Sequence, residues 1–236
     1  SGAGTLGYVL EVYHRENDGF KTILPATGGG YDGSDDTGLQ RTDYLFKLGW
    51  EPNAMHRFEA KVGYSDMEAN ETYLGLTEAD FSQRAEARYP ASRFDNIATY
   101  HSRFYLRHEF NPNPDLQLTT TAYYNRFHRN WYKLDRVNGT SLSSIMFNDD
   151  PLYPVLTGSA AGELKVKANN RDYYSAGLQS NLARRFSSGS WNHKLTAGFR
   201  YHTDRIRRYQ FADLYQQNAD GSVQNNPGFS GPGNEG

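Results

Sequence analysis

Apolar and polar residues alternate one by one along separate stretches of this chain, and this period of two constrains its fold more than any other feature. The stretches are residues 6–13, 44–50, 58–65, 103–110, 116–124, 176–182 and 195–202. Successive side chains of a β-strand point to opposite faces, so a two-residue period predicts strands with one apolar and one polar face. No stretch shows a convincing helical period. The sequence therefore predicts an all-β protein.

The connections between the expected strands alternate strictly in length. Residues 52–55, 111–115 and 187–191 are short and rich in Pro, Asn, Ser or Gly, as tight turns require. Residues 16–40, 66–98, 128–172 and everything after residue 208 are long. Long loops at one end and short turns at the other are typical of an antiparallel up-and-down transmembrane β-barrel with short periplasmic turns and long extracellular loops. We expect this chain to form about seven strands of such a barrel.

One face of these strands is apolar and the other is polar, which is compatible with both a membrane barrel and a soluble β-sandwich. Aromatic rings cluster beside the short turns, which favours the girdle that marks a membrane interface. These rings are Trp50, Phe58, Phe110, Phe186 and Trp191. The opposite face is polar and would line a wet lumen; it carries Glu11, Lys47, Glu59, Lys61, Arg103, Arg107, Glu109, Gln117, Gln179, Asn181 and Arg200.

Composition and motifs exclude several function classes. The net charge is -2 at pH 7, whereas nucleic-acid-binding domains usually carry a strong basic excess. The chain has no Cys, and it lacks a nucleophile elbow, a phosphate-binding loop and a dinucleotide fingerprint. The acidic stretch "DGSDDTG" at residues 32–38 lacks the spacing of a calcium loop. We therefore expect neither an enzyme, nor a nucleic-acid-binding protein, nor a resident metal or other cofactor.

One of the long connections contains a recognisable motif. The segment "TYLGLTEADFSQRAEARYPASRFD" has the pattern Gly-Leu-Thr-x-x-Asp-Phe and then Arg-Tyr-x-x-Ser-x-x-Asp. The matching residues are Gly75, Leu76, Thr77, Asp80, Phe81, Arg88, Tyr89, Ser92 and Asp95. Together with "YVLEVYHRENDGFKT" upstream, this pattern resembles TonB-dependent outer-membrane receptors of the ferric-citrate or siderophore type. The resemblance covers roughly residues 6 to 135.

The resemblance implies a barrel of about 22 strands around an N-terminal plug, in the bacterial outer membrane. Residues 1–236 would then be part of the barrel domain, and the plug and the TonB box would lie outside this chain. The implied function is active import of an anionic ferric chelate, ferric citrate or another siderophore, with iron only as part of the substrate. The implied partners are the TonB-ExbB-ExbD complex, through the plug, and outer-membrane lipid and lipopolysaccharide. Residues 71–95 would form an extracellular loop able to fold over the ligand.

Basic and aromatic residues near the expected loop end are the candidate ligand contacts, because Arg matches the geometry of carboxylates. The resemblance implies that Arg129 occupies the position of a ligand-contacting arginine. The other basic candidates are Arg126, Lys133, Arg88 and Arg93. Trp131 and Tyr132 are candidates for stacking on an aromatic siderophore. The alternative is that the cations tether loops and that the rings belong to an upper aromatic girdle.

Two other functions remain open from the sequence. A passive, porin-like channel would have no plug and a loop folded into the pore. A soluble β-rich carbohydrate-binding or adhesion domain would pack the apolar face into a protein core, so it would stay folded without detergent.

Overall fold

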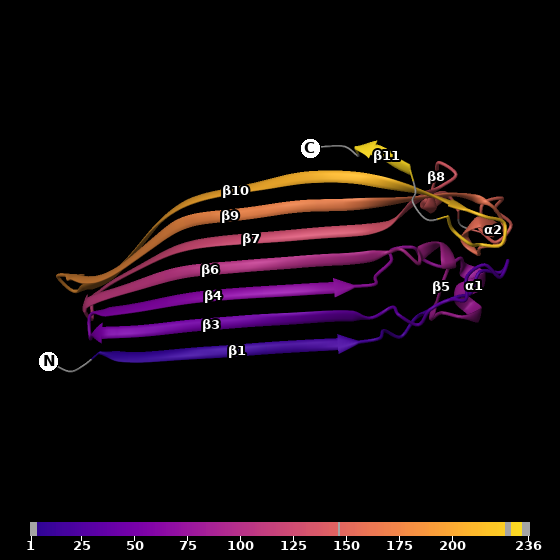
Figure 1. The fold of residues 1–236 in the computed structure, drawn as a ribbon. Helices are drawn as coiled ribbons and strands as arrows, with labels where there is room; N and C mark the ends of the chain where they lie inside the picture. Colours follow the sequence, from indigo (N-terminus) through magenta and orange to yellow (C-terminus); the bar gives the residue numbers. More distant parts are fainter. Residues whose placement is uncertain (1–3, 146, 225–227, 233–236) are drawn as a thin grey trace.

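The computed structural model describes residues 4–145, 147–224 and 228–232 as one large antiparallel sheet with a set of folded loops at one end (Figure 1). The order of the main strands is β1-β3-β4-β6-β7-β9-β10-β11. Their bounds are β1 Thr5–Asn17, β3 Leu39–Asn53, β4 His56–Ala69, β6 Asn96–Asn113, β7 Leu116–Val137, β9 Gly162–Ser188, β10 Trp191–Gln217 and β11 Gly228–Pro232. All seven expected strands are therefore present, each paired with its neighbour along the chain in up-and-down order.

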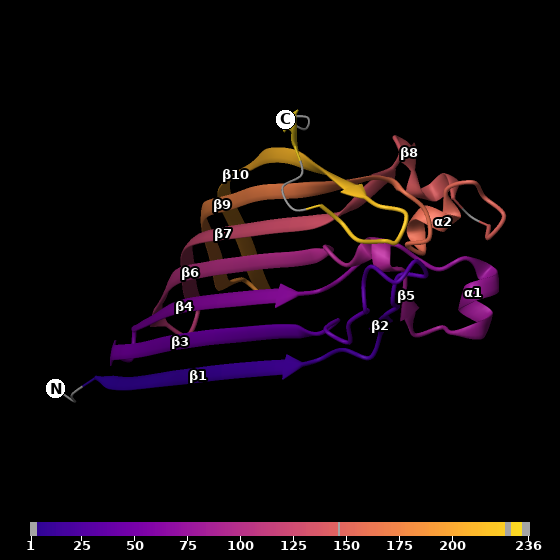
Figure 2. The same ribbon diagram turned by 45° about the vertical axis from the view of Figure 1, so that its right-hand side comes forward.

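The smaller elements lie in the connections. They are β2 Thr22–Ile23, β5 Ala87–Arg88, β8 Thr140–Ser141, α1 Glu78–Gln83, α2 Tyr153–Leu156 and the 3-10 turns Pro90–Ser92 and Leu142–Ser144. The tight turns after β3, β6 and β9 lie together at one end of the sheet, which we call the turn end (Figure 1). The long connections lie together at the other end, which we call the loop end (Figures 1 and 2).

The strands extend further into the long connections than the sequence predicted. β7 continues to Val137, β9 begins at Gly162 and β10 ends at Gln217, so the expected loops 128–172 and beyond 208 are partly strand. The expectation of loop structure near the C-terminus is also wrong for Gly228–Pro232, which pairs with β10 as β11. Apolar alternation is interrupted at residues 126–130 of β7 and 169–172 of β9, where polar residues occur on both faces, so the pattern did not join the outer part of each strand to its inner part.

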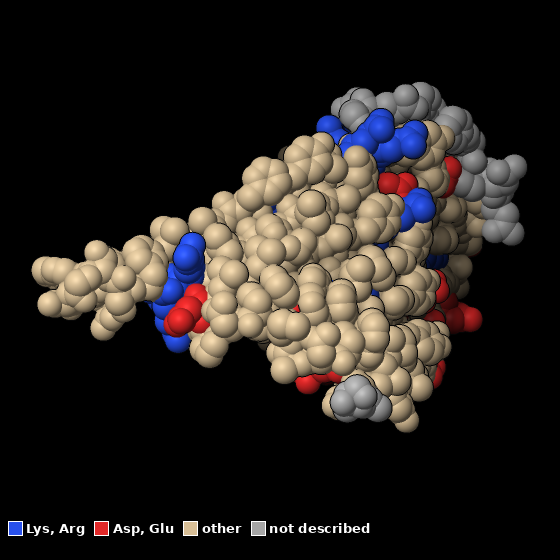
Figure 3. Space-filling view, turned by 90° about the vertical axis from the view of Figure 1, so that its left-hand side faces the viewer, with Lys and Arg blue, Asp and Glu red and all other residues tan. Residues whose placement is uncertain are grey.

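Strand pairing in register sorts the side chains into two continuous faces. Residues such as Leu10, Phe46, Val62, Phe104 and Tyr124 share one face, the apolar face, because each is the direct partner of the next or sits two residues from it. Side chains on this face are open: Leu10 is 69% exposed. Figure 3 shows the resulting broad surface almost free of charged residues. The opposite side, the polar face, carries Glu11, Lys47, Lys61, Arg103, Gln179 and Arg200.

Aromatic side chains border the apolar face near both ends. At the turn end, Trp50 stacks on Phe58 with ring centroids 5.5 Å apart, and His56 stacks on Phe110 at 4.8 Å. Phe186 stacks on His193 on the β9–β10 hairpin at 4.9 Å. Toward the loop end the same face carries a row of tyrosines: Tyr44, Tyr64, Tyr124, Tyr174 and Tyr201. This two-sided arrangement is the one expected of an apolar band between two aqueous boundaries.

The enclosed hydrophobic core of this chain is at the loop end. Leu134 and Val137 of β7 and Leu164 and Val166 of β9 are fully buried, and they pack with residues of the loops, including Tyr89. These loops lie over the extension of the apolar face, because Leu134 and Val166 are direct partners on that side. Within the described residues, no helix is both long and apolar enough to cross a membrane.

Candidate ligand-binding site

Three arginines lie side by side on the polar face where the sheet reaches the loop end. Arg129 of β7 is the direct partner of Arg171 of β9, and Arg171 is the direct partner of Arg208 of β10. We call this set the arginine row. Like charges directly opposite each other destabilise a sheet. Three in succession across adjacent strands concentrate positive charge at one place on the polar face.

A second pair of cations lies four residues further along the same face. Lys133 of β7 is the direct partner of Lys167 of β9. The Lys133 Nζ lies 3.3 Å from the ring centroid of Tyr73 and 4.2 Å from that of Trp131, so the ammonium is held between two aromatic rings. Burial lowers the pKa of Lys133, and the carboxylates of Asp135 and Asp95 act in the opposite direction.

Next to the arginine row, on the side toward the turn end, lies an open hollow of about 440 Å³, a volume within the range of small-molecule sites. Phe127, Tyr173 and Ile206 occupy one register row and supply its apolar lining. Asn125 and Ser175 add polar groups at its lower edge, where the Asn125 amide donates to the Ser175 hydroxyl at 3.2 Å. The polar face thus presents aromatic and cationic side chains next to each other.

The cations of this face keep much of their capacity to bind an anion. In the part of the chain that the structure describes, Arg129, Lys133, Lys167, Arg171 and Arg208 form no ion pair within 4.0 Å. The buried Nε of Arg129 has no hydrogen-bond partner. The Nε of Arg171 donates to the Asn169 Oδ1 at 3.0 Å, which orients this guanidinium along the strand. A buried guanidinium donor without a partner is costly, and an anionic ligand would satisfy it.

The structure separates the predicted site residues into three groups. Arg129, Trp131 and Lys133 lie together on the polar face, as a common site requires. Arg126 and Tyr132 lie on the other side of the sheet, because they stand an odd number of residues from Arg129. The Tyr132 hydroxyl donates to Asp213 at 2.7 Å, so this ring serves the packing of β10 against β7.

Arg88 and Arg93 form the third group, and both are engaged within the loops. Arg88 is buried, and its guanidinium donates to the carbonyl oxygens of Asn70 at 2.5 Å and Ser92 at 2.9 Å. Arg93 donates to the carbonyl oxygen of Gly221 at 2.8 Å and lies 4.5 Å from the ring centroid of Tyr31. Burial lowers the pKa of both guanidinium groups. In this conformation both arginines tether loops.

Three cations of this face, Lys167, Arg171 and Arg208, were not predicted as site residues. Lys167 and Arg171 lie in the expected connection 128–172, and Arg208 lies at the border of the expected connection that follows it. A signal was present nevertheless. Leu164, Val166 and Ala168 alternate with Lys165 and Lys167 in "ELKVKANNRD", which is the strand pattern of a half-buried sheet. The row itself could not be found this way, since it depends on which strands pair and in what register.

The loop that carries the recognised motif is a folded structure with a carboxylate at its centre. Asp80 accepts hydrogen bonds from the hydroxyls of Tyr89 at 2.6 Å and Tyr153 at 2.8 Å, and from the Asn148 amide at 3.0 Å. Burial opposes ionisation of Asp80, but these bonds and one from Thr77 outweigh it and keep the pKa of the carboxyl below its usual value. Asp80 thereby joins the connection 70–95 to the connection 138–161.

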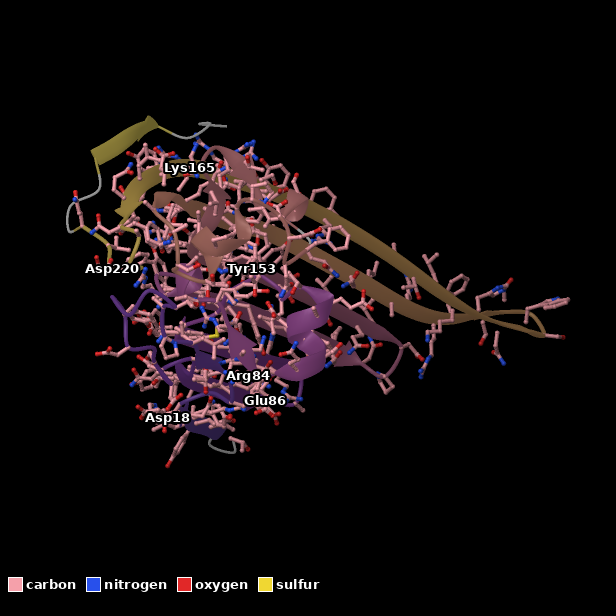
Figure 4. The ribbon with its side chains drawn as sticks, turned by 90° about the vertical axis from the view of Figure 1, so that its right-hand side faces the viewer. Asp18, Arg84, Glu86, Tyr153, Lys165 and Asp220 are labelled. Carbon is pink, nitrogen blue, oxygen red and sulfur yellow. The ribbon has the colours of Figure 1, made fainter. Side chains whose placement is uncertain are left out.

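Figure 4 looks onto the loop end. Tyr153 lies near the centre, Arg84 and Glu86 lie beside α1, and Lys165 marks the start of β9 above them. Among the described residues, no group of three or more His, Asp or Glu side chains is placed to hold a metal ion.

Solved structures share this arrangement of strands. The ferric citrate transporter FecA, unliganded, aligns with 96% of this chain at a TM-score of 0.56 and 16% identity. The ferric-catecholate import receptor Fiu from E. coli K12 aligns with 96% at 0.59 and 13% identity. BauA, the ferric preacinetobactin receptor from Acinetobacter baumannii, aligns with 96% at 0.54 and 10% identity. The sheet is a segment of a β-barrel.

The aligned part is about a third of each of those proteins, at 32%, 34% and 31% of their chains. No protein-family profile matches the sequence, and no curated protein matches it at a significant level. At these identities the likeness establishes the fold, and the function has to be argued from the residues of this chain.

Proposed function

We propose that this chain is part of the barrel wall of a TonB-dependent receptor that imports an anionic ferric chelate across the bacterial outer membrane. The observation that carries the proposal is the arginine row on the polar face, Arg129–Arg171–Arg208. A barrel fold puts the polar face toward the lumen, where an imported ligand would pass. The resemblance of the loop motif and the named cargo of the similar structures support the same class.

The composition of the site suits a chelate that is both anionic and aromatic. Planar guanidinium groups bind carboxylate or catecholate oxygens through paired hydrogen bonds. The neighbouring rings of Trp131, Phe127 and Tyr173 would stack on an aromatic chelate. Ferric citrate would use the cations alone, whereas a ferric catecholate would use the cations and the rings. Iron enters as part of the substrate, and no reaction at a resident cofactor is proposed.

The remaining parts of the machinery would lie in the rest of the receptor. A plug would fill the lumen, and coupling to the TonB-ExbB-ExbD complex would run through it. The apolar face would contact outer-membrane lipid, and the turn end would face the periplasm. In this scheme the chain supplies binding and transport, not catalysis, and the similar structures are likewise transport receptors.

The test is ligand binding by the full-length receptor that contains this chain, purified from outer membranes. Ferric citrate and a synthetic ferric catecholate are titrated while tryptophan fluorescence quenching is followed. We expect Arg129→Ala combined with Arg171→Ala to weaken binding of the recognised chelate by about tenfold or more, because each loses charge-assisted hydrogen bonds. Arg126→Ala is the control for the change on β7, since it removes one positive charge from the strand of Arg129 on the other face.

Unchanged affinity in the double variant for both chelates would contradict the assigned site. The two alternative functions have their own readouts in the same preparation. Steady ion conductance in a planar bilayer without TonB would indicate a porin-like channel. A protein that stays monodisperse without detergent would indicate a soluble β-domain.

A further inference from the structure

Three arginines mark the place where the apolar face ends on β7 and β10. Along β7 the apolar face runs through Ala122 and Tyr124 and then reaches Arg126. Arg126 is the direct partner of Tyr174, and Tyr174 is the direct partner of Arg205. Arg207 stands two residues beyond Arg205 on the same side of β10. We call Arg126, Arg205 and Arg207 the border arginines.

The border arginines leave most of their charge uncompensated. The Nη2 of Arg126 lies 3.8 Å from the Asp172 Oδ1, a carboxylate that His128 also contacts at 3.1 Å, and 54% of the Arg126 side chain is exposed. Arg205 and Arg207 are exposed, and neither forms an ion pair in the described part of the chain. Among the described residues, Asp172 is therefore the one carboxylate paired with a border arginine, and it is shared with His128.

The surroundings of these cations are amphipathic aromatic rings on one side and open solvent on the other. Tyr174 lies between Arg126 and Arg205 in register and stacks on Tyr124 with ring centroids 6.3 Å apart. Tyr201 of β10 is 65% exposed on the same face. In Figure 3, basic atoms gather at the rim of the uncharged surface. Tyrosine with an adjacent cation is the composition of a membrane interface, where rings sit at headgroup depth and cations meet lipid phosphates.

The face on which they lie excludes these arginines from the ligand site. Arg126 and Arg129 are three residues apart on one strand and point to opposite sides of the sheet. A ligand held by the arginine row cannot contact them through the sheet. Arg126 and Arg205 lie on strands separated by β9, so their backbones are about 10 Å apart. A headgroup with two phosphates can bridge this distance.

We propose that Arg126, Arg205 and Arg207 bind the phosphate groups of an anionic lipid in the outer leaflet, with the acyl chains lying along the apolar face below. The inference rests on the proposed membrane location of that face, but not on the identity of the imported chelate. Arg suits this role because its planar fork donates two parallel hydrogen bonds to phosphate oxygens. In this arrangement the tyrosines of the apolar face near the loop end would contact the glycerol or sugar region of the bound lipid.

The experiment uses the full-length receptor in phosphatidylethanolamine nanodiscs, with and without lipid A as the phosphorylated probe. Native mass spectrometry after release from the disc counts retained lipid A molecules, and thermal unfolding is recorded in parallel. The test variant is Arg126→Gln, Arg205→Gln and Arg207→Gln together. The matched control is Arg103→Gln, Arg107→Gln and Arg200→Gln together. This variant also removes three positive charges, but from the polar face of the sheet.

We expect the wild-type protein and the control to retain lipid A and to be stabilised by it, and the border variant to retain about tenfold less with no stabilisation. Equal retention by the border variant would overturn the inference. So would full displacement of lipid A by millimolar inorganic phosphate, since the site would then recognise free phosphate. A wild-type protein that does not enter nanodiscs at all would instead refute the proposed membrane function. Ferric-chelate binding is also measured on each variant, so that failure of the lipid site can be told apart from failure of the proposed import function.

Discussion

At the scale of single residues, Asp95 completes the edge of a strand. β7 continues past the first residue of β6, so the N–H of Leu134 has no strand partner on that side. The Asp95 Oδ1 accepts this N–H at 2.6 Å, and its Oδ2 accepts the Thr72 hydroxyl at 2.5 Å. A buried backbone donor must find an acceptor, and here a carboxylate supplies it. Asp95 is only 2% exposed, so its ionisation state affects the stability of the loop end.

This burial predicts a pH dependence of the loop end. Burial raises the pKa of Asp95 to about 6, against the hydrogen bonds from Thr72 and Leu134 and the charges of Arg88 and Lys133. For a carboxyl whose pKa is raised in the folded state, the stabilising contribution is complete below the usual value near 3.8 and is lost as the pH rises through about 6. The difference corresponds to about 3 kcal/mol.

The measurement is hydrogen exchange of the amides of residues 70–95 in the full-length protein, corrected for intrinsic rates, at pH 5 and pH 8. We expect stronger protection at pH 5 in the wild-type protein. Asp95→Asn keeps one acceptor oxygen and cannot ionise, so its protection should be nearly the same at both values. An equally strong pH dependence in D95N would assign the effect to another group.

At the scale of elements, adjacent residues of one strand lie on opposite faces of the sheet and therefore in different environments. Phe46 and Leu45 are adjacent in β3, yet Phe46 lies on the apolar face and Leu45 is the partner of Glu11 on the polar face. The same substitution at these two positions therefore tests which environment each face meets. If the apolar face contacts lipid, a charge at Phe46 must be placed in hydrocarbon, whereas a charge at Leu45 remains in a wet lumen.

We expect Phe46→Arg to destabilise the receptor by about 2–4 kcal/mol in bilayers and Leu45→Arg to cost little. Folding into vesicles across a urea series, followed by the heat-dependent gel mobility of the barrel, measures both variants under one condition. If both variants lose the same stability, the two faces do not differ in environment, and the assignment of lipid and lumen is wrong.

At the scale of the whole molecule, the sheet has open edges. β1 pairs only with β3 in the described structure, and its other side presents thirteen residues of unpaired backbone. An edge exposed to lipid leaves its N–H and C=O groups without partners, which a bilayer does not tolerate. Pairing of these edges with further strands is the arrangement that a closed barrel requires.

The open edges of the sheet predict that the native protein is larger than 26.8 kDa. An antibody raised against this chain should detect, in the outer-membrane fraction of the source cells, a band far larger than 26.8 kDa whose mobility shifts on heating. The shift arises because a closed barrel resists detergent unfolding until it is heated. A band at 26.8 kDa in the soluble fraction would contradict the barrel and favour the soluble β-domain.

The sequence alone determined the strands and their two faces. Alternation is a local property, since the direction of a side chain depends only on its position along its own strand. The same parity placed Arg126 and Arg129 on opposite faces before any pairing was known, although the sequence analysis grouped them together. The positions of the tight turns were also readable, because Pro, Asn and Gly restrict the backbone within a few residues.

The tertiary structure decided what the strands bring together. Arg129 and Arg171 are 42 residues apart in sequence, and only the register of β7 against β9 makes them partners. The buried roles of Arg88 and Arg93 likewise depend on contacts with loops distant in sequence, which no local pattern encodes. Composition can suggest that a site is cationic. Only the pairing of the strands decides which cations of different strands lie next to each other on one face.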